Sequence, residues 1–241
     1  MKTYLLAAVA VFAMSQVAHA ADFIPDAGYD WTGVYAGLNA GYAWTDTSGT
    51  DIDGWTVIDG ETINADGGAF VGGAQLGYNW QSNSLVGGVE TDINYVGGSD
   101  TGTTVSAPFD NHVESDGGFL GTLRLRAGFA ADRFLVYGTG GLAFGDIGTH
   151  WYDNGGTFGL DTGSNMRVGW AAGAGVEYAV TDSASVKLEY LHFDLGSETE
   201  NATNFRFGGG PPANYCGGSA TCSFKLKTAG DLLRIGFNLK F

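Results

Sequence analysis

Apolar and polar residues alternate along most of this chain, and the alternation restarts eight times. In the last segment every second residue from Leu233 to Phe241 is apolar, while Arg234 and Lys240 stand among the residues between them. A period of two puts the two kinds of residue on opposite faces of a β-strand. The eight segments, from first to last apolar residue, are 34–44, 70–80, 85–95, 119–129, 134–144, 168–180, 186–190 and 233–241. The pattern predicts an all-β chain with eight two-faced strands.

The connections between these segments fall into two lengths. Tight turns are expected at 81–84, 131–132 and 181–183, whereas the connections at 46–67, 97–117, 146–165 and 197–227 are much longer. Long structureless loops are uncommon in a compact soluble domain. Short turns at one end and long loops at the other are typical of barrels that span the bacterial outer membrane. We therefore expect an eight-stranded antiparallel up-and-down transmembrane β-barrel with short periplasmic turns and four long extracellular loops.

A water-soluble barrel with its apolar face turned inward is the alternative, and the aromatic residues argue against it. With the strands running alternately up and down, aromatic residues gather at both strand ends. Those expected at the loop end are Trp44, Phe70, Tyr95, Phe119, Phe144 and Trp170, and those at the turn end are Tyr78, Trp80, Phe129, Phe134, Tyr178 and Phe241. Two such rings match the interfacial girdles of a barrel whose apolar face contacts lipid.

The opposite face of the strands carries charges that must point into the lumen. These residues are Glu90, Asp92, Arg124, Arg126, Arg167, Glu177, Lys187, Glu189, Arg234 and Lys240. Buried charges need partners. The third and fourth segments offer two carboxylates against two guanidinium groups, and the sixth and seventh offer Glu177 beside Lys187 and Glu189. Because an eight-stranded barrel is narrow enough for side chains to fill, we expect this charge network to block the lumen.

The first twenty residues have the pattern of an export signal. Lys2 precedes an apolar run from Leu5 to about Met14, and the segment ends in Ala18-His19-Ala20. A membrane anchor is the alternative, but the run is roughly half of the ~20 residues that a spanning helix needs. We predict a signal peptide at 1–20 that is cleaved after Ala20, an N-terminal periplasmic segment at 21–30 and a barrel at 31–241.

Composition narrows the function classes. The chain of 241 residues is 44% hydrophobic and 13% aromatic, which excludes a disordered acidic chain. Its formal charge of −15 argues against nucleic acid as a partner, because phosphate binding needs clustered Lys and Arg. The only two cysteines, Cys216 and Cys222, lie close together in an exported chain, so a disulfide is expected. A metal or redox pair is the rival interpretation, but the usual site spacings are missing.

Catalysis is poorly supported, and we predict that the protein is not an enzyme. The histidines left after cleavage, His112, His150 and His192, lie in or near three different predicted loops. A lipid-modifying enzyme would require His150 or His192 to meet a loop serine. The glycine-rich stretch at 138–145 lacks the following helix and the lysine of a phosphate-binding loop, so no cofactor is predicted.

The first predicted loop is acidic and invites comparison with a calcium-binding loop. It has no Lys or Arg, and Gly49 stands where an EF-hand would need its first Asp. Its acidic residues are Asp46, Asp51, Asp53, Asp59, Glu61 and Asp66. No metal site is therefore assigned, and divalent-cation binding stays open as an alternative to a solvated loop.

Three stretches carry a family resemblance over nearly the whole mature part. They are "WTGVYAGLNAGYAW" at the start of the barrel, "GAGVEYAVTDSASVKLEYLHFDLG" at 173–196, and the terminal aromatic. They resemble the small outer-membrane β-barrel family of alphaproteobacteria, the opacity-protein-like major surface antigens that are often labelled porins. The end of the chain, with Gly236, Leu239 and Phe241, also resembles the signal that the barrel-assembly machinery reads in such proteins.

The resemblance and the pattern together imply an integral protein of the Gram-negative outer membrane, in contact with outer-membrane lipid and lipopolysaccharide. The leading expectation is a structural, surface-antigen role in which the barrel displays acidic extracellular loops. One alternative is a narrow porin-like channel for small solutes. Another is an adhesin or small-ligand receptor that binds an extracellular ligand or host surface through its loops.

Overall fold

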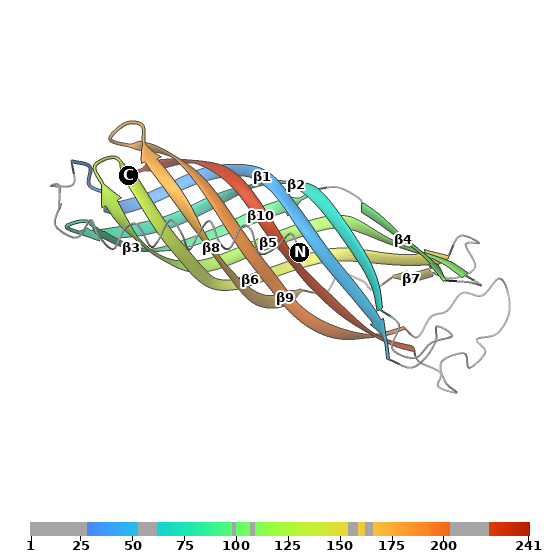
Figure 1. The fold of residues 1–241 in the computed structure, drawn as a ribbon. Coiled ribbons are helices and arrows are strands. Elements are labelled where there is room, and N and C mark those ends of the chain that lie inside the picture. The colour runs from blue at the N-terminus through green and yellow to red at the C-terminus, as the bar shows by residue number, and fades with distance from the viewer. Residues whose placement is uncertain are drawn as a thin grey trace, which may run out of the picture.

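The protein is a closed antiparallel β-barrel in a computed structural model that describes residues 28–52, 62–97, 100–106, 109–153, 159–161, 166–202 and 222–241 (Figure 1). The ring consists of β1 (Gly33–Asp51), β2 (Thr62–Ser82), β3 (Leu85–Val96), β5 (Phe109–Ala131), β6 (Phe134–Asp153), β8 (Arg167–Ala179), β9 (Ala184–Ala202) and β10 (Cys222–Lys240). Two short strands, β4 (Asp100–Ser106) and β7 (Gly159–Asp161), pair with the loop ends of β5 and β6. Within the described residues, no helix has the length and hydropathy that crossing a membrane requires. The predicted eight-stranded barrel is confirmed.

The last strand closes the ring against the first. Strand β10, red in Figure 1, pairs with the blue β1 along its length, from Tyr35 opposite Lys240 to Asp51 opposite Phe224. The Phe241 backbone N–H extends this ladder by donating to the Val34 carbonyl at 2.9 Å. Closure leaves no open sheet edge between these strands, so backbone groups at membrane depth are paired within the ring.

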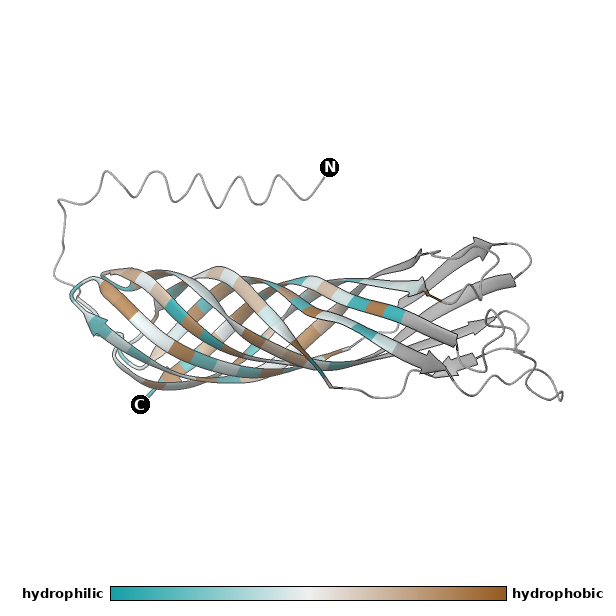
Figure 2. Ribbon diagram, turned by 90° about the horizontal axis from the view of Figure 1, so that it is seen from below, coloured by the Kyte–Doolittle hydropathy of each residue, from teal (hydrophilic) through white to brown (hydrophobic). Residues whose placement is uncertain are grey.

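The predicted faces of the strands are confirmed by burial. Exposed and buried residues alternate along β3, and apolar residues such as Leu38, Leu125 and Ile235 are exposed on the outside. Figure 2 shows brown apolar residues recurring along the strands, with paler or teal residues between them. Phe119 and Phe144 of the loop-end ring are half-buried rather than exposed, whereas the other ten aromatic residues of the two predicted rings are exposed.

The short turns also form where the sequence predicts them. Asn83 and Asp132 begin the two-residue turns that join β2 to β3 and β5 to β6, and both have a positive φ, at 54° and 52°. Asn and Asp tolerate this left-handed conformation better than most residues because their short polar side chains can bond locally. The third turn, at 180–183, is closed by a bond from the Val180 N–H to the Ala184 carbonyl at 2.8 Å.

The strands extend beyond their predicted ends on the loop side. Residues 46–50 and 62–67, predicted as loop, continue the ladder between β1 and β2. Alternation could not reveal these parts because both faces of a strand meet water once it leaves the membrane, so the apolar period disappears while backbone pairing continues. For the same reason, β10 begins at Cys222, inside the connection that was predicted at 197–227.

The chain enters the barrel through a short segment that we call the N-terminal plug, Gly28–Thr32. Tyr29 and Trp31 are buried at the turn end of the lumen, with their rings edge to face at 4.8 Å. The Trp31 N–H donates to the Gln81 side chain at 2.8 Å, and the Lys240 ammonium lies 4.4 Å from the Tyr29 ring centroid. The plug therefore connects the first turn to the last strand. Burial of Tyr29 and Trp31 inside the turn end was not expected from the sequence.

Candidate functional site

The interior of the barrel is filled in three layers, which we treat together as the candidate functional site. At the turn end, the plug packs in an apolar cluster with Val86, Ala130, Leu135, Tyr137 and Ala179. The middle layer holds the charged residues. The loop-end layer is apolar and consists of Ala43, Ala69, Val71, Val96, Leu120, Ala143, Ala171, Leu191, Phe193, Leu195 and Leu232.

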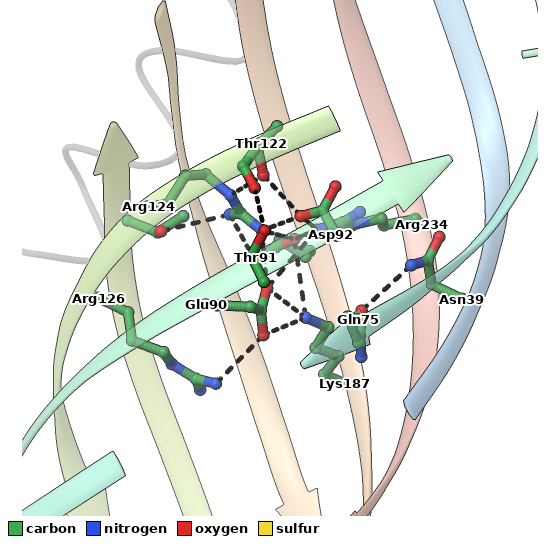
Figure 3. Close-up of polar contacts among 12 residues, drawn as sticks. Asn39, Gln75, Glu90, Thr91, Asp92, Thr122, Arg124, Arg126, Lys187 and Arg234 are labelled. Carbon is green, nitrogen blue, oxygen red and sulfur yellow. Dashed lines mark hydrogen bonds and ion pairs between the residues drawn. The ribbon is translucent and has the colours of Figure 1, made fainter. Parts of the chain in front are cut away.

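Arg124 lies at the centre of the charged layer and is 1% exposed. Its Nη2 atom donates to Glu90 Oε1 at 2.7 Å and to Asp92 Oδ2 at 2.8 Å, and its Nη1 atom lies 3.1 Å from Glu189 Oε2. The Nε atom donates to the Thr122 hydroxyl at 2.8 Å. Figure 3 shows Arg124 reaching from β5 toward Glu90 and Asp92 on β3. One guanidinium group therefore links three carboxylates on two strands.

Two further cations complete this part of the network. Arg234 on β10 donates through Nη2 to Glu189 Oε1 at 2.6 Å and to Asp92 Oδ2 at 3.0 Å. Lys187 on β9 reaches across the lumen and donates to both oxygens of Glu90 at 2.8 Å. Each of these carboxylates thus has at least two cationic partners, as buried charges require.

A second group lies around Arg126, which is 4% exposed. Its Nη2 atom donates to Glu177 Oε2 at 2.7 Å, and its guanidinium carbon lies 4.0 Å from the Tyr137 ring centroid. The Tyr35 hydroxyl accepts from Arg126 Nη1 at 2.8 Å and donates to Glu90 Oε2 at 2.7 Å. Tyr35 therefore joins the two groups of charges into one network.

Side-chain amides continue the network to the first two strands. Asn39 donates to Gln75 at 3.2 Å, Gln75 donates to Asn238 at 2.6 Å, and Asn238 donates to Glu177 at 2.8 Å. Ser185 adds a hydroxyl bond to Glu177 at 2.5 Å. Every strand of the ring therefore contributes a side chain to the interior network or to the layers above and below it.

Glycines on the inner face make room for the largest of these side chains. A Cβ atom on Gly175 would lie 2.6 Å from the Tyr137 hydroxyl, and one on Gly41 would lie 2.7 Å from the Arg234 Cβ. A Cβ on Gly77 would collide with the Tyr35 ring. The inward glycines thus let an eight-stranded barrel hold arginine and tyrosine in its interior.

The middle layer is balanced in charge. It contains four carboxylates and four cations, and each of the eight is at most 4% exposed. The members are Glu90, Asp92, Glu177 and Glu189 with Arg124, Arg126, Lys187 and Arg234. Among the buried side-chain atoms that are described, Trp31 Nε1, Asn39 Oδ1, Asn79 Oδ1 and Arg126 Nε have no hydrogen-bond partner. The buried charges of the middle layer therefore compensate one another.

The structure differs in detail from the pairs that the sequence suggested. Glu90 does lie opposite Arg124 in the ladder, but Arg126 lies opposite Gly88 and bonds Glu177 from another strand. Glu177 lies opposite Lys187 in the ladder, yet its hydrogen bonds go to other residues.

The other two predicted lumen cations lie outside the eight-residue network. Arg167 lies nearer the loop end, where it donates to Thr228 at 2.8 Å. Lys240 is bonded to the Asp30 carbonyl in the plug. Each therefore extends the polar contacts of the interior toward one end of the barrel.

The residues of the predicted assembly signal occupy both faces of β10. Leu239 and Phe241 point outward, and Phe241 is 81% exposed. Gly236 faces inward, where an added Cβ would lie 3.0 Å from the Lys187 side chain. The apolar part of the motif is thus open to lipid, while its glycine serves the packing of the lumen.

The remaining candidates of the sequence analysis are only partly described. The side chains of His112 and His150 fall outside the described ones, as do Cys216 and all the acidic residues of the first loop except Asp46. His192 is on the outer face of β9. Among the described residues, no group of three or more His, Cys, Asp or Glu could hold a metal ion.

A closed antiparallel ring with an apolar outer face, aromatic ends and a filled polar interior defines a transmembrane β-barrel of the Gram-negative outer membrane. The family model described as "Outer membrane protein beta-barrel domain" matches residues 4–210. The chain belongs to this family, and it is an outer-membrane protein.

The chain is similar to outer-membrane proteins of the alphaproteobacteria Brucella and Rhizobium. The chain is 38% identical over 216 residues to the 31 kDa outer-membrane immunogenic protein of Brucella melitensis, covering 81% of this chain and 88% of that protein. It is 28% identical over 252 residues to the 25 kDa outer-membrane immunogenic protein of Brucella abortus, covering 100% and 99%. The 22 kDa outer membrane protein of Rhizobium leguminosarum is 35% identical over 147 residues, covering 60% and 62%.

Solved structures that resemble the chain are also bacterial barrels. The outer membrane protein OprG of Pseudomonas aeruginosa is 15% identical, with a TM-score of 0.44 over 90% of this chain and 99% of that one. Neisserial surface protein A is 15% identical, with a TM-score of 0.42 over 87% and 98%.

Proposed function

We propose that the protein is a closed surface barrel whose role is structural and antigenic: it anchors acidic loops outside the cell and does not conduct solutes. The single observation that carries this proposal is the charge-balanced network in the lumen, with apolar layers on both sides of it. Side chains fill the interior of an eight-stranded ring. The barrel then acts as a support for what it displays.

Charge is distributed in a way that supports display. Because the eight network charges cancel, the formal charge of −15 arises elsewhere in the chain. The four long predicted connections hold fifteen Asp and Glu, against Arg206, Lys225 and Lys227. A dense negative charge outside the membrane repels other polyanions and attracts cations. The extracellular face is therefore proposed to be an acidic surface.

A deletion strain distinguishes this role from the two alternatives. If the role is structural, loss of the protein should sensitise cells to detergent and leave the uptake of small solutes unchanged. Reduced uptake would favour a narrow porin-like channel, and lost attachment to host surfaces would favour an adhesin or receptor. Complementation with a variant whose residues 53–61 are replaced by a short Gly-Ser link distinguishes the role of the barrel from the role of the first loop. If the barrel alone stabilises the envelope, this variant should restore resistance to detergent although part of the acidic loop is missing.

Export and assembly form part of the same proposal. We infer that residues 1–20 are removed after Ala20 and that the segment from Ala21 to Asp30 leads into the barrel on the periplasmic side. The barrel-assembly machinery is the proposed partner that reads Gly236, Leu239 and Phe241. The outward exposure of Phe241 supports this partner because a recognition element must be accessible.

Deleting Phe241 should impair assembly in the cell more than stability in vitro. We expect the truncated chain to accumulate in the periplasm or to be degraded, yet to fold into detergent or lipid when purified. Ile235→Lys is the matched contrast, because a charge near mid-membrane costs ~2–4 kcal/mol in a barrel while the terminal aromatic stays intact. Cell fractionation and urea unfolding measure the two effects. Wild-type levels of the truncated chain in the outer membrane would refute the assembly signal.

A disulfide between Cys216 and Cys222 is a further element of the proposal. It rests on export and close spacing, since exported chains meet an oxidising compartment. Both thiols should resist alkylation in isolated outer membranes until a reductant is added. Because the proposed bridge would close a short stretch at the loop end, Cys216→Ser should leave the urea midpoint of the barrel nearly unchanged. Rapid labelling of both thiols without reductant would exclude the bridge.

A further inference from the structure

Three polar residues share the outer face of the barrel on two neighbouring strands, and the lumen network does not use them. Tyr190 and His192 belong to β9, and Asp231 belongs to β10 directly opposite His192. We call them the outer polar cluster. They lie on the same face of β9 and β10 as Leu188 and Leu233, which are exposed on the outside of the barrel. An ionisable residue on a lipid-facing strand is rare and marks a functional site by default.

The cluster is organised around one carboxylate oxygen. The Tyr190 hydroxyl donates to Asp231 Oδ1 at 2.6 Å, and His192 Nδ1 lies 2.9 Å from the same oxygen. Because a carboxylate can only accept, Nδ1 carries the proton in this contact. Within the described part of the chain, Asp231 Oδ2 has no partner, and the Asp231 side chain is 29% exposed. The carboxylate is therefore held in place and presents one free acceptor to the outside.

The surroundings fix the depth of the cluster in the membrane. Trp44 of the loop-end aromatic ring lies opposite Asp231 on β1, and the Trp170 ring lies 5.4 Å from the His192 ring. Tryptophan at such positions sits at the level of the lipid headgroups. The Lys227 ammonium lies 3.4 Å from the Asp194 carboxylate, on the loop side of the cluster. From mid-membrane toward the loops, the outer face therefore presents apolar residues, then the Asp231 carboxylate, and then the exposed Lys227 ammonium group.

We infer that the outer polar cluster binds a glycolipid of the outer leaflet whose acyl chains carry amide N–H and hydroxyl donors at their junction with the sugar. The inference rests on the outer-membrane role and adds its lipid partner. Asp231 Oδ2 presents an acceptor, whereas the acyl junction of an ordinary glycerophospholipid offers only ester oxygens, which also accept. Amide-linked hydroxyacyl chains on an aminosugar supply donors at this depth, and Lys227 is placed to meet phosphate above them.

Lipid A is the probe that tests this site on the full mature chain. In phosphatidylcholine vesicles, the urea midpoint of Asp231→Leu sets the baseline for this variant, because the change removes a carboxylate from the outer face together with its bonds to Tyr190 and His192. Lipid A should raise the urea midpoint of wild type and leave that of Asp231→Leu unchanged. In native mass spectrometry, the variant should retain about tenfold less lipid A, the effect of one lost hydrogen bond to a charged group.

Two controls keep the result specific. Asp146→Leu removes a carboxylate from β6 near the loop end, outside the outer polar cluster, and it should keep the full response to lipid A. Phosphatidic acid carries phosphate on ester-linked chains and should give no shift. An equal response of wild type and Asp231→Leu to lipid A, or an equal shift with phosphatidic acid, would overturn the inference. Failure of wild type to fold in any bilayer would instead count against the barrel role.

Discussion

Replacing Arg124 by Met should lower the free energy of unfolding of the barrel in lipid by about 3–5 kcal/mol, the cost of removing one partner from a buried ion pair. Arg124 bonds Glu90, Asp92 and Glu189 in the centre of the lumen. Its loss leaves four carboxylates facing three cations where water does not compensate them. Urea unfolding in phospholipid vesicles, followed by tryptophan fluorescence, measures the change.

A second variant separates charge imbalance from lost packing. Adding Asp92→Asn to Arg124→Met restores equal numbers of both charges, and we expect it to recover part of the lost stability because Asn still accepts from Arg234. Leu125→Met changes the neighbouring lipid-facing residue with little change in volume and should cost less than about 1.5 kcal/mol. If Arg124→Met were as mild as Leu125→Met, the network would not be a stabilising element of the lumen.

Trp31→Ala should cost about 3–5 kcal/mol, the usual range for a buried tryptophan. Trp31 is 3% exposed and packs in the turn-end cluster with Tyr29 and Leu135. Its removal should leave a cavity in the plug and weaken the contact between the first turn and the last strand. The same urea assay measures the loss, and protease cleavage near Gly28 should become faster if the plug detaches.

Trp31→Phe is the matched control for the plug. The Trp31 Nε1 atom is buried without a hydrogen-bond partner, so phenylalanine loses ring volume but also removes an unsatisfied donor. We expect Trp31→Phe to retain most of the stability that Trp31→Ala loses. Equal urea midpoints for wild type and Trp31→Ala would mean that the plug does not stabilise the closed barrel.

The sequence predicted the membrane-spanning part of the fold because lipid imposes a strict period on it. Leu38, Leu125 and Ile235 could be assigned to the outer face because each lies in a run whose alternate residues are polar or small. Outside the membrane that constraint ends. The polar stretch from Asp46 to Asp51 therefore carried no signal for the strand that continues there.

The interior was predictable residue by residue but not contact by contact. Because alternate residues of a strand face inward, Glu90 and Arg124 could both be assigned to the lumen, and they lie opposite each other on neighbouring strands. The bond from Arg126 to Glu177 spans strands that are not adjacent, so it depends on the diameter and stagger of the closed ring. Tyr29 and Trp31 were missed as plug residues because they precede the first predicted strand, and two buried aromatic residues are too few to reveal a period.

Single-channel recording of the purified wild-type protein in planar bilayers tests the closed lumen most directly. The charged layer and the two apolar layers should leave no continuous water path, so we predict small or no steady conductance. Arg124→Met provides a comparison. If the charge network is the barrier to ions, this variant should show conducting events more often than the wild-type protein. Large, reproducible conductance steps from pure wild-type protein would contradict the account and make a narrow channel the better description.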